Sequence, residues 1–373
     1  MVSARVFVTE LLEKADIQIG GNRPQDITVY DERFFNRVIR YGTLGLGEAY
    51  MDGWWDANAL DAFINKALSA HVERGIAINL ASVLTLAKAF LFNLQSRERA
   101  FTVGEVHYDL GNDLYEAMLD KRMVYTCGYW GGSPQKTLDE AQEAKLELVC
   151  KKMGLQKGDH ILDIGCGWGS FAKYAAEKYG VSVVGLTVSK EQAVLARELC
   201  KGFPIEIRVQ DYREVNEQFD RIVSLGMFEH VGVKNHRTYF EVANRCLKDD
   251  GLFLLHTIGY PISCLTSDPW INKYIFPGGL LPSIAQLGKA TERLFIVEDL
   301  HNFGADYDKT LMAWFKNFDR AWPRLKGKYG ERFYRMWKYY LLICAGAFRA
   351  RDTQLWQIVL SKGGVPGGYQ SVR

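Results

Sequence analysis

Residues 160–170, HILDIGCGWGS, decide the fold of this chain. The short apolar run from Ile161 to Ile164 is typical of a buried strand, and a helical pattern follows from 171 to 179. Three glycines stand at alternate positions between the two: Gly165, Gly167 and Gly169. Glycines at such a turn let the backbone approach a ligand closely, and the next helix points its first amides at that ligand. Asp163, two residues before the first glycine, favours a ligand with an ammonium and a sulfonium over a pyrophosphate.

This strand, turn and helix resemble motif I of the class I methyltransferases, which bind S-adenosylmethionine. The later part of the chain alternates strands and helices, as a doubly wound, Rossmann-like α/β sheet requires. We expect strands at 182–186, 205–209, 221–225 and 252–257, with helices near 191–200 and 236–247. We further expect an antiparallel closing pair of strands at 295–299 and 355–361.

Length and composition indicate an ordinary globular protein of two domains. The chain has 373 residues, of which 48% are hydrophobic and 24% charged, and its formal net charge is +2. That charge gives no global field favouring nucleic acid, so we expect none as a partner. The first residues do not resemble a signal peptide, no apolar run is long enough to span a membrane, and the seven cysteines lack C-x-x-C pairs. We therefore expect a cytoplasmic protein with reduced thiols.

We expect a small α+β domain at 1–95, a polar linker at 96–105, and a catalytic domain at 106–373. In the first domain the pattern predicts a helix over Val6 to Ala15, a strand at 26–30 and a helix at 34–39. The stretch GTLGLGEAYMDGWW, residues 42–55, predicts a turn region of a small core in which the glycines serve turns, and a ligand site is the second interpretation.

The stretch Gly75 to Leu94 is the most apolar helical segment, and Arg97 and Arg99 follow it directly. A helix lying in a membrane interface has this pattern, but an ordinary amphipathic domain helix explains it equally well. The sequence leaves the two alternatives open.

Two long insertions follow strands of the expected sheet. Residues 270–282 form an apolar, aromatic loop, and residues 307–350 form two helices that are rich in aromatic side chains. Aromatic stripes at helical spacing usually form core. Because ligands bind beyond strand C-termini in such sheets, an apolar substrate tunnel is the second interpretation.

Cofactor contacts are expected where the second and third strands end. An acidic residue commonly holds the ribose at the second strand, but this strand ends in Thr187, with Gln192 nearby, so either these two hold the ribose or the site is degenerate. At the third strand's end, Asp211 and Tyr212 suit an adenine amino group and an aromatic face.

The chemistry is expected where further strand ends converge. Glu229 follows the fourth strand and His256 closes the fifth. A carboxylate and an imidazole beside a methyl-donor site favour acid–base work over two satisfied core residues. A metal site formed by these two with Cys127 is conceivable from ligand types alone, but the local spacing does not support one.

Eight ordered motifs resemble the cyclopropane-fatty-acyl-phospholipid synthases, which are part of the mycolic-acid cyclopropane synthase superfamily. They are DIGCGWG, HYDLGNDLY, YTCGYW, GMFEHVG, LLHTIG, DPWINKYIFPGG, HNFGADYD and AGAFRARDTQLWQ. The resemblance covers nearly the whole chain, including the region GTLGLGEAYMDGWW. In this family a Thr-x-Ser-x-x-Gln pattern is usual, so Thr187 and Gln192 no longer imply a degenerate site.

The resemblance implies methyl transfer from S-adenosylmethionine to the cis double bond of a phospholipid acyl chain, with ring closure by loss of a proton. It also implies a bound bicarbonate as the base, a lipid-binding first domain, a homodimer, and peripheral attachment to the inner face of a membrane. Tyr125 and Thr126 match cofactor contacts. The positions that match the bicarbonate cradle are Cys127, Glu229, His256, Ile258 and Tyr307.

Cys344 matches a cysteine that is sometimes given as the active residue of the family. Methyl transfer to an alkene needs no covalent enzyme intermediate, so we expect Cys344 to be a core residue. Two rival functions remain open: a methyltransferase that leaves a methyl-branched chain, and a non-catalytic lipid-transfer protein.

Overall fold

The computed structural model describes residues 3–72, 111–133 and 135–373. The predicted linker and the segment Gly75 to Leu94, with Arg97 and Arg99, lie outside these residues. Within the part that is described, no helix is both long enough and apolar enough to cross a membrane.

The chain folds as two compact units. The first, here called the helical unit, comprises Met1–Phe92, Leu265–Pro277 and Tyr307–Thr353. The second, here called the sheet unit, comprises Asn93–Cys264, Gly278–Asp306 and Gln354–Arg373. Two segments that we assigned by sequence to the catalytic domain, 265–277 and 307–353, thus pack with N-terminal residues instead. The reason is that helices in these segments pack against α2 (Arg33–Met51) and α3 (Leu60–Ser69) of the helical unit.

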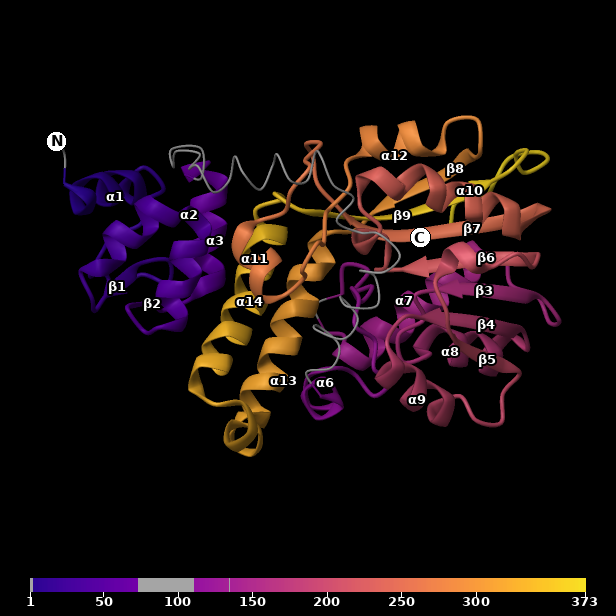
Figure 1. Ribbon diagram of the computed structural model, residues 1–373, viewed down its shortest axis with the longest axis horizontal. Coiled ribbons are helices and arrows are strands. Elements are labelled where there is room, and N and C mark those ends of the chain that lie inside the picture. Colours follow the sequence, from indigo (N-terminus) through magenta and orange to yellow (C-terminus); the bar gives the residue numbers. More distant parts are fainter. Residues whose placement is uncertain (1–2, 73–110, 134) are drawn as a thin grey trace. The chain divides into compact units, whose positions relative to one another are not determined.

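The sheet unit contains a seven-stranded sheet in the order β5-β4-β3-β6-β7-β9-β8 (Figure 1). The strands are β3 (His160–Ile164), β4 (Ser182–Thr187), β5 (Ile205–Val209), β6 (Phe219–Leu225), β7 (Leu247–Gly259), β8 (Ile296–Asn302) and β9 (Gln354–Ser361). Neighbours from β5 to β7 are parallel, whereas β9 is antiparallel to both β7 and β8. The predicted doubly wound sheet and its antiparallel closing pair are confirmed.

Two helices precede β3, and further helices and turns connect the strands as a doubly wound fold requires. They are α6 (Asn112–Met118), α7 (Leu138–Lys152), α8 (Ser170–Tyr179), α9 (Lys190–Leu199), α10 (His236–Cys246) and α12 (Ile284–Thr291), with short 3₁₀ turns η2 (Tyr212–Glu214), η3 (Phe228–His230) and η4 (Val233–Asn235). Local sequence fixes where α7 begins, because Thr137 and Glu140 form a reciprocal capping box.

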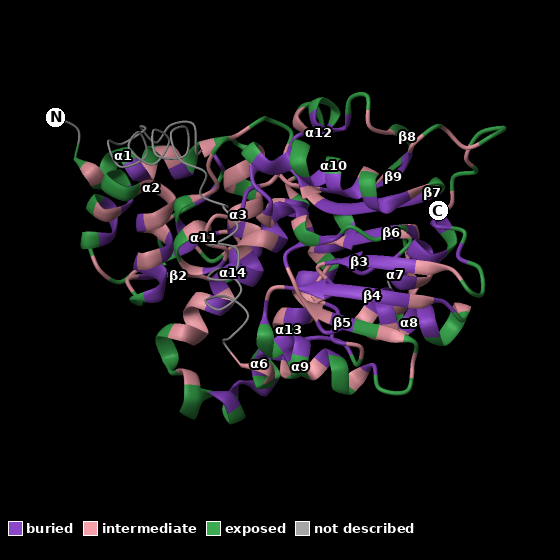
Figure 2. Ribbon diagram, turned by 45° about the vertical axis from the view of Figure 1, so that its right-hand side comes forward, coloured by how far each residue is buried: buried purple, intermediate pink, exposed green. Residues whose placement is uncertain are grey.

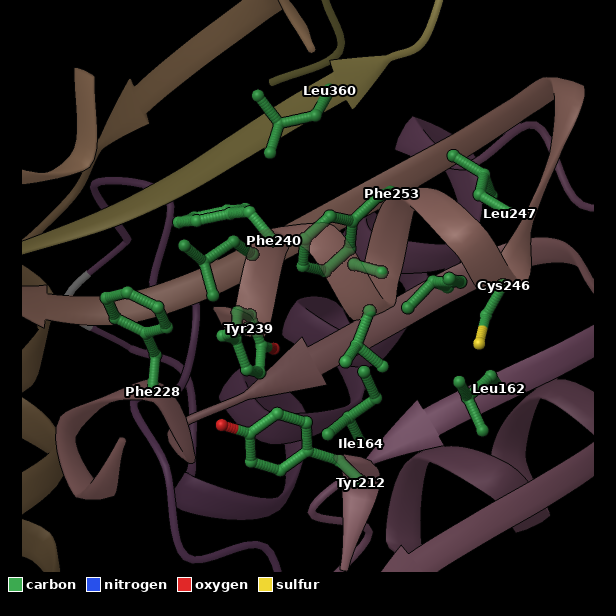
Figure 3. Packing of buried hydrophobic residues seen from close by; sticks show 14 of the residues in the cluster. Leu162, Ile164, Tyr212, Phe228, Tyr239, Phe240, Cys246, Leu247, Phe253 and Leu360 are labelled. Carbon is green, nitrogen blue, oxygen red and sulfur yellow. The ribbon is translucent and has the colours of Figure 1, made fainter. Parts of the chain in front are cut away.

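Each face of the sheet packs into its own hydrophobic cluster. Leu162, Phe253 and Leu360 belong to the face that α10 and α12 cover (Figure 3). Their strand neighbours Ile161 and Leu254 belong to the opposite face, together with residues of α7 and α8. Figure 2 shows the central strands buried and the helices exposed on their outer sides. Because side chains alternate along a strand, Asp163 lies on the same face as Ile161, toward α7 and α8.

The helical unit is built mainly from α1 (Ala4–Glu13), α2 (Arg33–Met51), α3 (Leu60–Ser69), α11 (Pro269–Tyr274), α13 (Ala305–Tyr329) and α14 (Glu331–Arg349). A two-stranded antiparallel sheet, β1 (Ile27–Val29) with β2 (Trp55–Ala57), completes it. The elements that we predicted for the first 40 residues are confirmed.

The prediction that residues 42–55 form a turn region is largely wrong, because α2 runs to Met51 with one non-helical residue at Gly42 (φ 58°, ψ −134°). The next glycines serve close packing. A Cβ on Gly45 would stand 2.3 Å from the Arg37 carbonyl oxygen, and one on Gly47 would stand 2.3 Å from the Trp270 ring. Gly45 therefore lets the two arms of α2 approach each other across the kink at Gly42, and Gly47 lets α2 approach Trp270.

The aromatic residues of the second insertion form the core of the helical unit. Trp314, Phe318 and Trp337 are fully buried, and Tyr339 packs at 4.7 Å from the Trp270 ring, centroid to centroid. The core interpretation is confirmed for these residues, whereas the substrate tunnel remains a prediction.

Candidate active site

The glycine-rich turn after β3 is shaped by three left-handed backbone conformations. Gly165, Gly167 and Gly169 have φ angles of 86°, 55° and 78°. Added Cβ atoms on Gly165 and Gly169 would meet Met227 at 2.6 Å and the Cys200 sulfur at 2.7 Å, so both glycines serve packing inside the protein. A Cβ on Gly167 would meet no atom within 4 Å. The open space at this residue suits close approach of a ligand.

Asp163 ends β3 beneath this turn and is buried, with 1% of its surface exposed. Its Oδ2 atom has no hydrogen-bond partner in the protein. Burial raises the pKa of this carboxyl to about 7, and the positive charge of Lys145 opposes that rise. A buried carboxylate oxygen without a partner is unusual in a folded protein and indicates a position where a ligand supplies the partner.

The segment Tyr125–Cys127 lies beside the same strand ends. Thr126 Oγ1 accepts a hydrogen bond from Lys145 Nζ at 2.8 Å, and the Thr126 carbonyl accepts one from Gln142 Nε2 at 2.7 Å. A Cβ on Gly226, directly after β6, would stand 2.6 Å from Thr126 Cγ2. The structure thus brings Thr126 against the turn that leads to Glu229.

An aromatic chain holds Tyr125 to the glycine-rich turn. The Tyr115 ring lies 5.2 Å from the Tyr125 ring and 5.0 Å from the Trp168 ring, and Trp168 Nε1 donates to Asn112 Oδ1 at 3.2 Å. Cys127 is fully buried, and its thiol donates to the Gly128 carbonyl at 3.2 Å.

The two neutral residues after β4 bind each other. The Thr187 hydroxyl donates to Gln192 Oε1 at 3.0 Å and accepts from the Ser189 amide at 3.2 Å. The Gln192 amide nitrogen is thereby oriented as a donor at this strand end. This arrangement suits a ligand with hydroxyl groups.

The residues after β5 have separate surroundings. Asp211 Oδ1 accepts from the backbone amide and the guanidinium of Arg213, both at 2.9 Å. The Tyr212 ring lies in the hydrophobic cluster against Tyr239, 5.2 Å between centroids, and its hydroxyl has no hydrogen-bond partner (Figure 3). Burial raises the pKa of Tyr212 to about 12. Adenine recognition by these two residues remains a prediction.

Glu229 and Ile258 come from the ends of neighbouring strands and contact each other. Glu229 Oε1 accepts from the Ile258 backbone amide at 2.6 Å, while Oε2 has no partner. Burial raises the pKa of Glu229 to about 7, and the Ile258 amide opposes the rise. The Ile258 amide therefore orients Glu229 and is not left over for an anion.

His256 is also buried, and one of its two ring nitrogens is satisfied. Gln357, opposite it on β9, lies with its Nε2 3.2 Å from His256 Nδ1. With that amide nitrogen as donor, the neutral ring carries its proton on Nε2, which has no partner. Burial holds the pKa of His256 well below its usual value. The ring is thus a neutral N–H donor whose Nε2 has no acceptor in the protein.

Two predicted residues belong to the helical unit. Tyr307 stacks at 4.5 Å from the Phe348 ring. Cys344 lies on α14, and burial raises the pKa of its thiol to about 12. Such a thiol is a poor nucleophile at neutral pH, which supports our expectation of a core residue.

Sequence reasoning missed Lys145, Gln142 and Gln357. The two residues of α7 carry a signal in hindsight, because they occupy the inward, otherwise apolar positions of that helix. Gln357 carries no such signal, since it meets His256 through strand pairing. Among the described residues, no group of three or more His, Cys, Asp or Glu side chains is arranged to hold a metal ion.

Comparison with known proteins gives consistent matches. Residues 95–358 match the family described as mycolic acid cyclopropane synthetase. The chain is 56% identical over 367 residues to a cyclopropane-fatty-acyl-phospholipid synthase of Escherichia coli (strain K12), covering 98% of this chain and 95% of that one.

Two solved structures resemble the chain over its larger part. The cyclopropane synthase MmaA2 from Mycobacterium tuberculosis has a TM-score of 0.67 and 33% identity, and the match covers 70% of this chain and 98% of that one. The mycolic acid cyclopropane synthase CmaA1, complexed with SAH and CTAB, has a TM-score of 0.66 and 35% identity over the same shares.

Proposed function

The chain belongs to the mycolic acid cyclopropane synthetase family, and from this premise we propose that it is a cyclopropane-fatty-acyl-phospholipid synthase. It transfers a methylene group from S-adenosylmethionine to the cis double bond of an unsaturated acyl chain in a membrane phospholipid, closing a cyclopropane ring. One observation carries the proposal. The open glycine turn and three buried polar atoms without protein partners, on Asp163, Glu229 and His256, gather at the carboxyl ends of neighbouring strands.

The residues present fit S-adenosylmethionine, which supplies an electrophilic methyl group when bound. The unpartnered Asp163 Oδ2 suits the cationic part of this molecule, and the open space at Gly167 admits it. We assign Thr187 and Gln192 to the ribose hydroxyls, Asp211 and Tyr212 to the adenine, and Tyr125 and Thr126 to further contacts with the cofactor.

The base is proposed to be a bound bicarbonate, held by the chain's own groups. His256 offers the N–H donor on Nε2, and Glu229 offers Oε2 as an acceptor for the O–H of the anion. A carboxylate beside an anion would repel it without a shared proton, and in the proposed arrangement the O–H of bicarbonate lies between the two groups as the donor to Glu229 Oε2. Cys127 and Tyr307 remain further members of the proposed cradle, and Ile258 acts in it through Glu229, which its amide orients.

The walls of the site favour ring closure over quenching by water. Cys127 and the residues around Glu229 and His256 are buried. An alkene is a weak nucleophile, so the site must hold the double bond in line with the methyl donor and exclude water. Aromatic faces near the acyl chain would stabilise the positive charge that forms on it.

The test is mass spectrometry of phospholipids after incubation of the protein with methyl-deuterated S-adenosylmethionine and vesicles of cis-unsaturated lipid. Cyclopropanation retains two of the three deuterium atoms, because one leaves as the proton that the base removes. A methyl-branched product retains all three. Lipid binding without any mass change would instead identify a lipid-transfer protein.

Peripheral membrane attachment and a homodimer are proposed on the resemblance and on the segment from Gly75 to Arg99. Each basic residue near an anionic surface contributes about 1 kcal/mol, screened by salt. Replacing Arg97 and Arg99 by Gln should weaken co-sedimentation with anionic vesicles at low salt, and sedimentation equilibrium should give the mass of a dimer. Unchanged vesicle binding after removal of residues 1 to about 100 would contradict the proposed attachment.

A further inference from the structure

Lys145 is a lysine that the structure removes entirely from water. It lies on the inward side of α7, and none of its surface is exposed. A buried ammonium is costly unless charged or polar groups compensate it. The groups around Lys145 therefore indicate why the fold retains it.

Two site segments meet this ammonium. Its Nζ atom donates to Thr126 Oγ1 at 2.8 Å, and its positive charge acts on Asp120, Cys127 and Asp163. Asp120 is already engaged, because its two oxygens accept from the backbone amides of Val124 at 2.8 Å and Arg122 at 3.0 Å. Asp163, by contrast, has an oxygen without a hydrogen-bond partner. Lys145 thus binds the Thr126 hydroxyl directly, and its positive charge favours the ionised form of a carboxyl group that has an unsatisfied oxygen.

We propose that Lys145 is a positioning residue of the cofactor site, which keeps Asp163 ionised and fixes the Thr126 hydroxyl before S-adenosylmethionine binds. The inference rests on the proposed function, since it assigns the cofactor to the glycine-rich turn. Lys145 does not touch the reacting atoms in this scheme. It acts through Asp163 and Thr126.

The electrostatics give the direction of the effect. Burial raises the pKa of Asp163 to about 7, and Lys145 opposes this rise. Burial also lowers the pKa of Lys145 to about 8, while Asp120, Cys127 and Asp163 oppose that change. A cationic ligand binds better to an ionised than to a protonated Asp163. Affinity should therefore be highest above pH 7 and fall as the pH decreases through the pKa of Asp163.

Other titratable groups face this pair without competing for the same role. Cys166, Cys200 and Tyr239 face Asp163, and burial raises the pKa of each. His256 lies within the field of Lys145, and burial keeps its ring neutral. Asp120 faces Lys145, and burial raises its pKa as well. Either Asp163 or Asp120 could cause a pH dependence of cofactor binding. The test therefore includes a variant of Asp163 itself, which shows whether that residue is the cause.

Helix α7 offers a matched control. Lys152 is likewise fully buried, but its Nζ contacts His301 Nδ1 at 3.1 Å and Asp299 Oδ2 at 3.6 Å. Loss of Lys152 removes a buried ammonium from the same helix without removing the positive charge that acts on Asp163. A general loss of packing should affect both variants alike.

The experiment is titration calorimetry of the full-length protein with S-adenosylmethionine from about pH 6 to 9, using the native chain, Lys145→Met, Lys145→Arg, Lys152→Met and Asp163→Asn. We expect Lys145→Met to move the midpoint of the pH dependence upward by about one unit, with roughly fivefold weaker binding at pH 7. Lys145→Arg and Lys152→Met should keep the native midpoint. Asp163→Asn should bind S-adenosylmethionine weakly, and its affinity should not fall further as the pH decreases.

An unchanged midpoint in Lys145→Met, or an affinity of Asp163→Asn that still falls as the pH decreases, would overturn the inference. If Lys145→Met does not fold, the pH dependence of affinity in Asp163→Asn still tests the inference. Absence of binding by the native chain at every pH would instead contradict the proposed function, which separates the two failures.

Discussion

Two buried aspartates, one in each unit, have opposite surroundings. Asp26 in the helical unit is 2% exposed, and its oxygens accept from the backbone amides of Gln18 and Arg23 and from the Arg23 guanidinium. These bonds lower the pKa of Asp26 to about 2. Asp163 in the sheet unit is 1% exposed, yet one oxygen has no partner and its pKa is raised to about 7. The first carboxylate serves the fold, whereas the unsatisfied oxygen of the second supports its proposed role in binding a ligand.

The same difference extends to other carboxylates of the two units. In the helical unit Glu48 accepts from Arg37, Lys273 and the Tyr274 hydroxyl. In the sheet unit Glu229 has one bonded and one unbonded oxygen. Unsatisfied charge in a buried position is expensive, so its concentration at adjoining strand ends identifies the functional face.

The largest expected effect comes from Gly167→Val. The substitution puts a branched side chain where Gly167 now has open space, so we expect binding of S-adenosylmethionine to fall below detection by calorimetry, with the fold kept. Gly154→Val is the matched control. Gly154 has nearly the same φ, 56°, and equally open space, but lies before β3, at the opposite end of that strand. Both variants carry the same backbone strain, so unchanged affinity in Gly167→Val would mean that the site is misplaced.

The next effect compares the two aspartates directly. Asp163→Asn should weaken cofactor binding at least tenfold at pH 8 while raising the free energy of unfolding by roughly 1–3 kcal/mol, because it removes an unsatisfied buried charge. Asp26→Asn should leave binding intact and lower the free energy of unfolding by about 2 kcal/mol. Calorimetry and denaturant unfolding measure both quantities. Equal losses of stability in Asp26→Asn and Asp163→Asn would mean that both carboxylates stabilise the fold, which contradicts the distinction between them.

The pH dependence of stability has opposite signs for the two groups. The pKa of Asp26 is depressed, so its contribution is present above about pH 4 and is lost as the pH falls toward 2. The pKa of Asp163 is raised to about 7, so the folded state binds the extra proton and stability decreases as the pH rises from about 4 to 7. Unfolding curves of the native chain and of Asp163→Asn, measured across this range, should differ in that slope.

A smaller and reversible effect is expected at Glu229. Glu229→Gln keeps the shape of the site but changes the acceptor for the O–H of the anion, so activity should fall and added bicarbonate should partly restore it. His256→Ala should lose more, since it removes the N–H donor and opens a cavity. Rates are measured in bicarbonate-depleted buffer and after titration with bicarbonate. Full activity without bicarbonate, and no rescue of Glu229→Gln, would leave Glu229 or His256 to take the proton itself.

Local pattern was sufficient for the sheet unit, because buried parallel strands are apolar runs and the glycine turn follows one directly. It failed at residues 42–47, where the glycines suggest turns. Gly47 is required by Trp270, more than 200 residues away, and no local pattern contains that contact.

The candidate site divides in the same way. Strand ends predicted Asp163, Glu229 and His256, since the carboxyl ends of parallel strands meet at one edge. Gln357 was not predictable, because it reaches His256 through an antiparallel strand, 101 residues later in the sequence. Lys145 was overlooked because a lysine on a helix is ordinarily solvated.

The smallest effect is expected at Cys344, and it separates the buried thiol of Cys127 from the half-buried thiol of Cys344. Cys127 lies among the strand-end groups of the sheet unit, whereas Cys344 lies on α14 of the helical unit, where burial raises the pKa of its thiol to about 12. A thiol that stays protonated at neutral pH cannot act as a nucleophile, and transfer of a methyl group to an alkene needs none. Cys344→Ala should therefore keep the rate of lipid cyclopropanation within about twofold and cost about 1 kcal/mol of stability through lost packing. Cys127→Ala, assayed beside it, should lower the rate of cyclopropanation by more than its loss of stability explains. A Cys344→Ala variant that folds normally but loses its activity would show that the helical unit contributes chemistry as well as packing.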